Sequence, residues 1–125
     1  MKIDIKKALL NSTTEFLMNL ELQGRISRAR MKLIFALNEA TEELQSDMQF
    51  IRKENKEDSD KTKKEIDELL EEKATIDLSK YTELMHDLYT ALENIDKKMA
   101  FPESYIHDEL LNAFDETQNN VEVVK

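Results

Sequence analysis

The chain has 125 residues, enough for one domain, and 36 % of them are charged against 40 % that are hydrophobic. One glycine and one proline leave little material for the tight turns of an all-β fold, so the composition favours helices with short or polar connections. The absence of cysteine excludes disulfide frameworks, thiolate zinc sites and thiol catalysis.

Charge is unevenly distributed along the chain. Residues 1–64 hold 13 Lys and Arg against 11 Asp and Glu, a net charge of +2, whereas residues 65–125 hold 5 against 16, a net charge of −11. Such an acidic half repels a phosphate backbone and suits a protein partner with a basic surface, or it serves only to keep the protein soluble. No stretch has the apolar length of a signal peptide or membrane span, so we expect a soluble cytoplasmic protein.

The N-terminal part of the chain predicts a short strand and a helix. Residues 2–5 alternate apolar and charged side chains, which is typical of a strand that needs a partner. A first helix is predicted over about residues 6–20, although residues 11–14 are poor helix formers and packing must hold them. Gly24, the only glycine, ends this helix or makes the turn out of it, because glycine adopts positive φ without strain.

A long central helix is predicted next, because apolar residues recur every three or four positions. These residues are Ile26, Ala29, Leu33, Leu37, Ala40, Leu44, Met48 and Ile51. Ser27 is a candidate N-cap of this helix. Met18 and Met31 are expected in the core. Phe35 and Phe50 lie off the apolar face, and we expect a second helix to cover them, with an interface as the alternative.

The central helix is followed by an exposed polar segment. Residues 52–64 contain no apolar residue and predict an exposed polar helix tip or loop. Chain reversal there returns Ile66, Leu69 and Leu70 along the central helix and makes a helical hairpin. Residues 75–78 then pair with residues 2–5 as a small two-stranded β patch.

The C-terminal part predicts two further helices. One covers about residues 80–99, with Asp77 or Ser79 as its cap, and the sequence Phe101-Pro102 breaks it. The last helix runs to about Thr117, with a buried face listed as Ile106, Leu110, Ala113 and Phe114. Residues 118–125 are expected to be a flexible tail. The sequence therefore predicts a mainly α fold, a bundle of four to five helices in a single domain over residues 1–117.

Two groups of charged side chains are candidate interaction sites. The basic group is Arg25, Arg28, Arg30 and Lys32, and the acidic group is Glu68, Glu71, Glu72, Asp108, Glu109, Asp115 and Glu116. Cations at the start of a helix oppose its dipole, which costs a few tenths of a kcal/mol each. They therefore indicate either an anionic partner or pairing with the acidic half of the same chain.

No motif predicts catalysis or a cofactor. The sequence has neither a nucleophile elbow nor a phosphate-binding glycine loop, so we expect a protein that is not an enzyme. Glu83 and His86 have the Glu-x-x-His spacing of a di-iron bundle, but His107 does not supply the required second copy. We therefore expect no metal and no cofactor.

The order of several segments resembles a known protein family. A start of the MKI type, LELQGRISRARMK at residues 20–32, the segment EEKATIDL and a closing SYIHDELLNAFDE are similar to small acidic proteins of unknown function encoded by temperate bacteriophages of Gram-positive bacteria. Gly24, Ser27, Arg28 and Arg30 match recurring positions of that family, while residues 52–64 look shorter than is typical. The resemblance implies a phage or prophage origin and identifies no catalytic residue.

Three functional hypotheses follow from these observations. The first is a protein of the bacterial cytoplasm that binds a basic host or phage protein, in one form inhibiting a host defence nuclease (anti-CRISPR or nucleic-acid-mimic type) through residues 65–125. The second is a virion or tail-assembly accessory protein that acts through helical oligomerisation. The third is a nucleic-acid-binding protein that uses residues 25–32, which we expect less because the chain is acidic.

Overall fold

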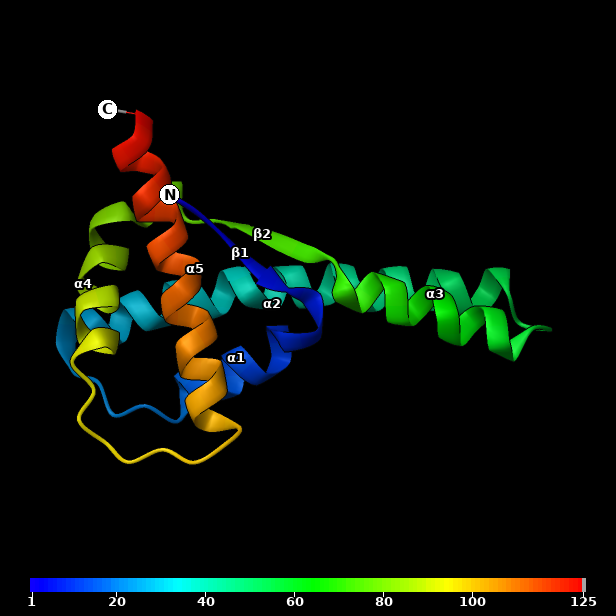
Figure 1. The fold of residues 1–125 in the computed structure, drawn as a ribbon, viewed down its shortest axis with the longest axis horizontal. Helices are drawn as coiled ribbons and strands as arrows, with labels where there is room; N and C mark the ends of the chain where they lie inside the picture. Colours follow the sequence, from blue (N-terminus) through cyan, green and yellow to red (C-terminus); the bar gives the residue numbers. More distant parts are fainter. Residues whose placement is uncertain (125) are drawn as a thin grey trace.

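The computed structural model describes residues 1–124, with side chains described through Thr117, and it confirms a mainly α architecture with a long central helix (Figure 1). Two short 3-10 helices, η1 (Lys7–Leu9) and η2 (Ser79–Tyr81), accompany the main elements. The α-helices are α1 (Leu10–Met18), α2 (Gly24–Glu54), α3 (Ser59–Glu71), α4 (Thr82–Glu93) and α5 (Glu103–Val124), and the strands are β1 (Lys2–Lys6) and β2 (Lys73–Asp77).

The predicted β patch is confirmed. β1 and β2 pair antiparallel, with Ile3 opposite Ile76 and Ile5 opposite Ala74. Ile3, Ile5 and Ile76 point into the core, and the alternate residues face solvent. The alternation of apolar and polar residues thus predicted both the strands and the face that they bury.

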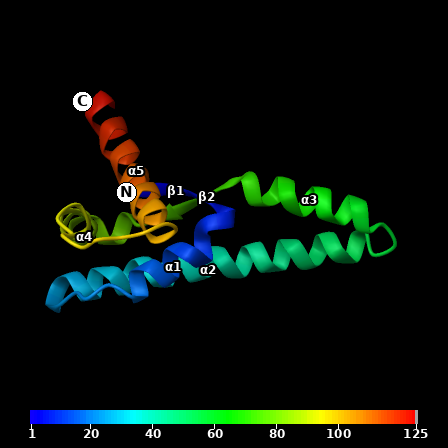
Figure 2. The same cartoon turned by 60° about the horizontal axis from the view of Figure 1, so that its bottom comes forward.

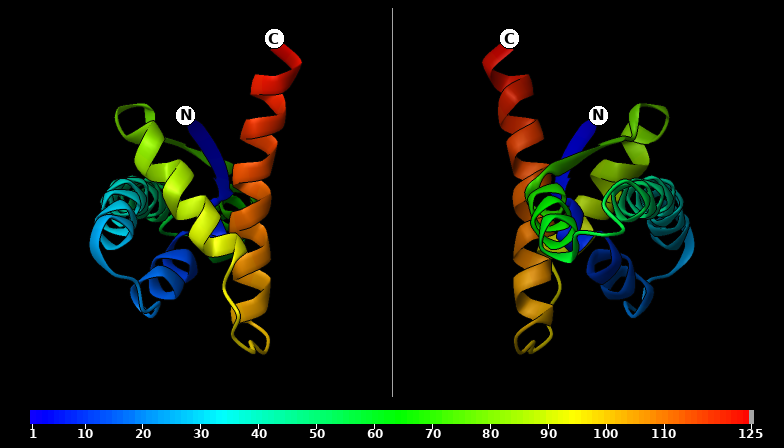
Figure 3. Two further views of the ribbon diagram at one scale, coloured as in Figure 1. Left: turned by 90° about the vertical axis from the view of Figure 1, so that its left-hand side faces the viewer. Right: turned by 90° about the vertical axis from the view of Figure 1, so that its right-hand side faces the viewer.

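The core lies between α2 on one side and α5 on the other, and α1, α4 and the β ribbon contact both of them (Figures 2 and 3). α2 begins at Gly24, whose φ of +59° is the left-handed conformation expected of the only glycine. Ser27 therefore lies inside the first turn, and its prediction as N-cap is wrong. Ala29, Leu33, Leu37 and Leu44 of the predicted face are buried.

Four residues expected in the core are exposed instead. Met18 is 64 % exposed, Phe35 56 % and Phe50 63 %, and Met31 is 38 % exposed. α1, α4, the ribbon and α3 pack on the other sides of α2, so no second helix covers Phe35 or Phe50 within the described residues. The elements that contact α2 cover only its core-facing sides, so Phe35 and Phe50 stay exposed.

The end of α2 and the whole of α3 form a hairpin that projects from the body (Figures 1 and 2). The Asp58 carboxylate caps α3 by accepting a hydrogen bond from the Lys61 backbone N–H at 3.0 Å. The polar tip at residues 52–64 is therefore two helix ends and a short turn. Asn55 departs from the predicted exposure, because it is buried and its side-chain N–H donates to Glu65 at 2.6 Å.

The helix predicted over residues 80–99 is wrong at its C-terminal end. α4 stops at Glu93, where the Asn94 side chain donates to the Thr90 carbonyl at 2.7 Å and its backbone N–H bonds the same turn. Ile95 and Met99 still pack on the core from the connection that follows. At the other end, the prediction of Asp77 or Ser79 as the cap is wrong, because the N-cap residue of α4 is Tyr81. Asp77 instead accepts hydrogen bonds from the Ser79 hydroxyl and backbone N–H, and these bonds lower the pKa of the Asp77 carboxyl.

α5 confirms the predicted buried face and corrects its length. Ile106, Leu110, Ala113 and Phe114 are all buried. The helix continues through Val124, so the tail predicted from residue 118 is helical as far as that residue, since nothing in QNNVEVV breaks a helix. Only Lys125 of that predicted tail lies outside the described residues. Among residues 1–124, none of the helices combines the length and apolarity that crossing a membrane requires.

Candidate functional site

Arg25 joins the start of α2 to α4. Its Nε lies 2.7 Å from an Asp87 carboxylate oxygen, and its Nη2 lies 3.7 Å from Glu83. Both carboxylates belong to the acidic half of the chain, so this arginine is paired internally. The Glu83 of the Glu-x-x-His motif is thereby occupied, and within the described residues no group of His, Asp and Glu side chains could hold a metal ion.

Arg30 closes the C-terminal end of α1. Its guanidinium donates to the backbone carbonyls of Leu17 and Leu20 and, at 2.9 Å, to the Ser27 hydroxyl. The last carbonyls of a helix have no partner within the helix, and a cation there is also attracted to the negative end of the helix dipole. Arg30 is therefore a structural cap, which explains one of the dipole-opposed cations of α2.

The other two basic candidates differ from each other. The Lys32 ammonium lies 5.3 Å from the centroid of the Tyr81 ring, a cation–π contact between α2 and η2. Arg28 is exposed and makes no ion pair among the described residues. Three of the four basic candidates thus have internal partners, and among the described residues only Arg28 has none.

The acidic candidates on α3 are separate from those on α5. Glu71 lies 3.6 Å from Lys6 and Glu72 lies 2.9 Å from Lys7, so both tie the base of the hairpin to the N-terminal segment. Glu68 is exposed on the hairpin itself. The structure therefore divides the predicted acidic set into a hairpin part and an α5 part.

The outer side of α5 is acidic, and it also carries the exposed Tyr105 and Asn112. Asp108 and Asp115 form one row and Glu109 and Glu116 another, each pair seven positions apart and so about 10.5 Å along the helix axis. α5 contains no Lys or Arg from Glu103 to Val124. Within the described residues, Asp108, Glu109 and Glu116 make no ion pair.

Asp115 is the exception on this face. It accepts a hydrogen bond from the Tyr89 hydroxyl of α4, which raises the pKa of that phenol because ionisation would place two negative charges together. The Tyr89 ring also packs edge-on against Phe114, with centroids 5.7 Å apart. Asp115 therefore anchors α5 to α4, while the other three carboxylates are available to a partner.

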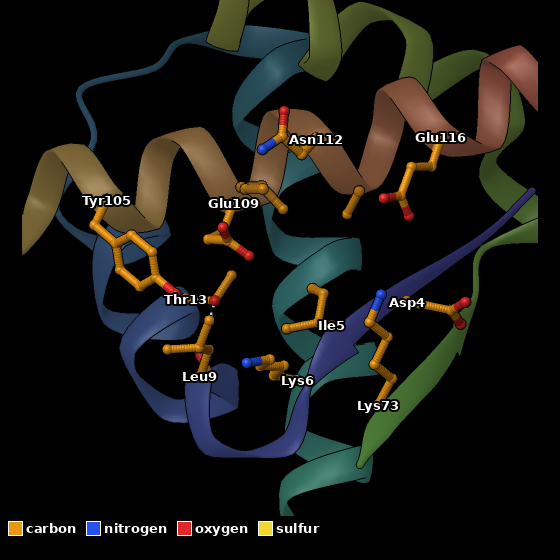
Figure 4. Close-up of a pocket in the computed structure, with 12 residues that line it drawn as sticks. Asp4, Ile5, Lys6, Leu9, Thr13, Lys73, Tyr105, Glu109, Asn112 and Glu116 are labelled. Atoms are coloured by element: carbon orange, nitrogen blue, oxygen red, sulfur yellow. Dashed lines mark hydrogen bonds between the residues drawn. The ribbon is translucent and has the colours of Figure 1, made fainter. Parts of the chain in front are cut away.

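A cavity of about 250 Å³ lies between α5, β1 and α1 (Figure 4). Glu109 and Glu116 of α5 form one wall, and Lys6 and Lys73 of the ribbon line the other. Its Thr13 hydroxyl is already donating to the Leu9 carbonyl at 2.7 Å. The sequence did not predict this cavity, because it depends on the position of α5 beside β1. Its mixed charge offers contacts to a polar ligand and no nucleophile–base pair.

Comparison of the chain with known protein families, with curated proteins and with solved structures finds no match. Inferences about function therefore depend on the charge and geometry of the surfaces described above.

Proposed function

We propose that the protein is a non-enzymatic binding protein that recognises a basic surface on a host or phage protein through the outer side of α5. The observation that supports this proposal is the combination of two acidic rows with the absence of any Lys or Arg in the same helix. Asp108, Glu109 and Glu116 bear the charge, because Asp115 is engaged by Tyr89.

Electrostatics favours a cationic partner for this face. Neighbouring carboxylates on one helix repel each other, and a basic surface relieves this repulsion when it binds. At physiological ionic strength the Debye length is about 8 Å, so the rows attract a partner mainly at close approach. Such an interface weakens as the salt concentration rises.

The specific form that we favour is inhibition of a host defence nuclease, with the carboxylates of α5 occupying a site that otherwise holds phosphates. The resemblance of residues 20–32 to proteins of temperate phages supports this form, since a phage benefits from blocking such an enzyme. The same resemblance supports a location in the cytoplasm of a bacterial host.

A comparative pull-down from a Gram-positive host lysate tests the proposal. The bait variant carries Asp108→Asn, Glu109→Gln and Glu116→Gln. A matched control carries Glu15→Gln, Glu21→Gln and Glu57→Gln, which neutralises three exposed acids outside α5. We expect the wild type and the control to retain the same basic protein and the α5 variant to lose it.

Two results would overturn the proposal: equal retention by the α5 variant, or an affinity for the isolated partner that does not fall between 50 and 300 mM salt, a range over which the Debye length shortens by about half. If the retained protein is a nuclease, its activity on DNA or RNA should fall when the wild-type chain is added. A partner that binds no nucleic acid would exclude the nuclease form and leave the binding role.

A second candidate function is that of a virion or tail-assembly accessory protein. The exposed apolar side chains Met31 and Phe35 on α2 favour it, because such residues are common in assembly interfaces. Mass spectrometry of purified virions tests this role, and absence of the chain from them would exclude it. Direct nucleic-acid binding is disfavoured, since Arg25 and Arg30 already have partners within the chain.

A further inference from the structure

The outer side of α2 carries an exposed line of three residues with opposite charges at its ends. Arg28, Phe35 and Glu42 follow at intervals of seven, so they lie on one side of the helix, and all three are exposed. Met31 lies beside them and is also exposed. α2 lies on the side of the body away from α5, as Figure 3 shows, so this line is distinct from the acidic side of α5.

The line is complementary to itself when reversed. Arg28 lies about 10.5 Å from Phe35 in one direction along the axis, and Glu42 lies the same distance away in the other. A second α2 that runs antiparallel, with a two-fold axis at Phe35, places Arg28 of each copy opposite Glu42 of the other. A parallel pair would instead bring like charges together, which disfavours that arrangement.

We propose that this side of α2 binds a second copy of the chain and forms an antiparallel two-fold dimer centred on Phe35. The aromatic ring and Met31 supply the apolar centre, and two symmetric Arg28–Glu42 pairs set the direction and register. Such a dimer leaves both α5 faces accessible on its outer sides, because α2 and α5 lie on opposite sides of the body (Figure 3).

Analytical ultracentrifugation of the full chain tests the dimer. At micromolar concentrations the wild type should sediment with twice the 14.7 kDa mass of one chain. Phe35→Asp should weaken dimerisation at least about tenfold, as loss of a central aromatic contact does. Phe50→Asp is the matched control, because Phe50 is an exposed phenylalanine of the same helix about 22 Å farther along it.

Charge exchange tests the register. Arg28→Glu alone and Glu42→Arg alone should each weaken the dimer, and the double variant should restore it because both pairs re-form with reversed sign. All these positions are exposed, so circular dichroism should be unchanged, and the melting temperatures should agree at concentrations where every chain is monomeric. A wild-type monomer at 100 µM, an unaffected Phe35→Asp dimer, or a double variant no better than the single ones would overturn the proposal.

Discussion

The basic segment at residues 25–32 and the outer side of α5 carry opposite charges, and the fold uses them differently. Arg25, Arg30 and Lys32 each contact a carboxylate, a backbone carbonyl or an aromatic ring of another element. Of the four acidic candidates on α5, only Asp115 has a hydrogen-bond partner in another element among the described residues. Two clusters that look equally conspicuous in the sequence therefore have different roles.

The physical reason for the difference is position. The first turns of α2 lie against the end of α1 and beside α4, where unpaired carbonyls and carboxylates need cations. On α5, Asp108 is exposed, and Glu109 and Glu116 line the cavity whose other wall carries the ribbon lysines. Among the described residues, no cation lies within ion-pair distance of these three carboxylates. A charged cluster is thus informative about binding only after its internal partners are known.

Of the substitutions that test this comparison, replacement of Arg30 should change the free energy of unfolding most. Arg30→Ala removes a donor to the Leu17 carbonyl of α1 and to the Leu20 carbonyl just beyond this helix, and we expect a loss of about 1–3 kcal/mol in the free energy of unfolding. Urea denaturation measures the loss, and amide exchange should show faster opening at the end of α1. Arg28→Ala, its control, should change stability by less than about 0.5 kcal/mol. Equal effects of the two variants would contradict the capping role.

Removal of the Tyr89 hydroxyl should cause the next largest loss in the free energy of unfolding. Tyr89→Phe keeps the ring contact with Phe114 and loses the bond to Asp115, which should cost about 1 kcal/mol at pH 7. The folded state raises the pKa of this phenol, so its stabilisation is complete below the ordinary pKa of about 10 and declines as the pH rises beyond it. The difference between wild type and variant should therefore shrink above pH 10 in thermal denaturation, and a constant difference would contradict this assignment.

The exposed ion pair of Arg25 should contribute less. A double-mutant cycle of Arg25→Ala and Asp87→Ala should give a coupling energy of about 0.2–1 kcal/mol, because both side chains are about half exposed. Raising the salt concentration to 1 M should reduce the coupling further. A coupling energy that salt does not change would indicate that the pair is more enclosed than its exposure implies.

Neutralisation of the α5 face should have the smallest effect on folding. The variant with Asp108→Asn, Glu109→Gln and Glu116→Gln should change the free energy of unfolding by less than about 0.5 kcal/mol per site, with stabilisation as the expected direction because like charges are removed. Thermal denaturation measures this change. A large destabilisation would show that these carboxylates are structural and would remove the contrast with Arg30.

Much of the fold was predictable because it depends on periodicity. The four buried positions of α5, the existence of a two-stranded ribbon and the hairpin of α2 and α3 all followed from apolar spacing and from one polar segment. The register of the ribbon did not, and its second strand covers residues 73–77 where residues 75–78 were predicted. The buried face of α5 and the hairpin depend on local sequence. The ribbon pairs two short strands that cannot bury their apolar faces alone. The acidic side of α5 was also identifiable, because a helix without any Lys or Arg is a property of the sequence itself.

Tertiary structure alone decided how the remaining side chains are used. The role of Arg30 depends on where α1 ends in space. The exposure of Phe35 depends on which sides of α2 the other elements cover, because the spacing of apolar residues does not determine how many elements pack on a helix. The sequence by itself determined the helices, the ribbon and the charges, whereas the contacts that neutralise one charged cluster and leave the other free arise only when distant segments pack together.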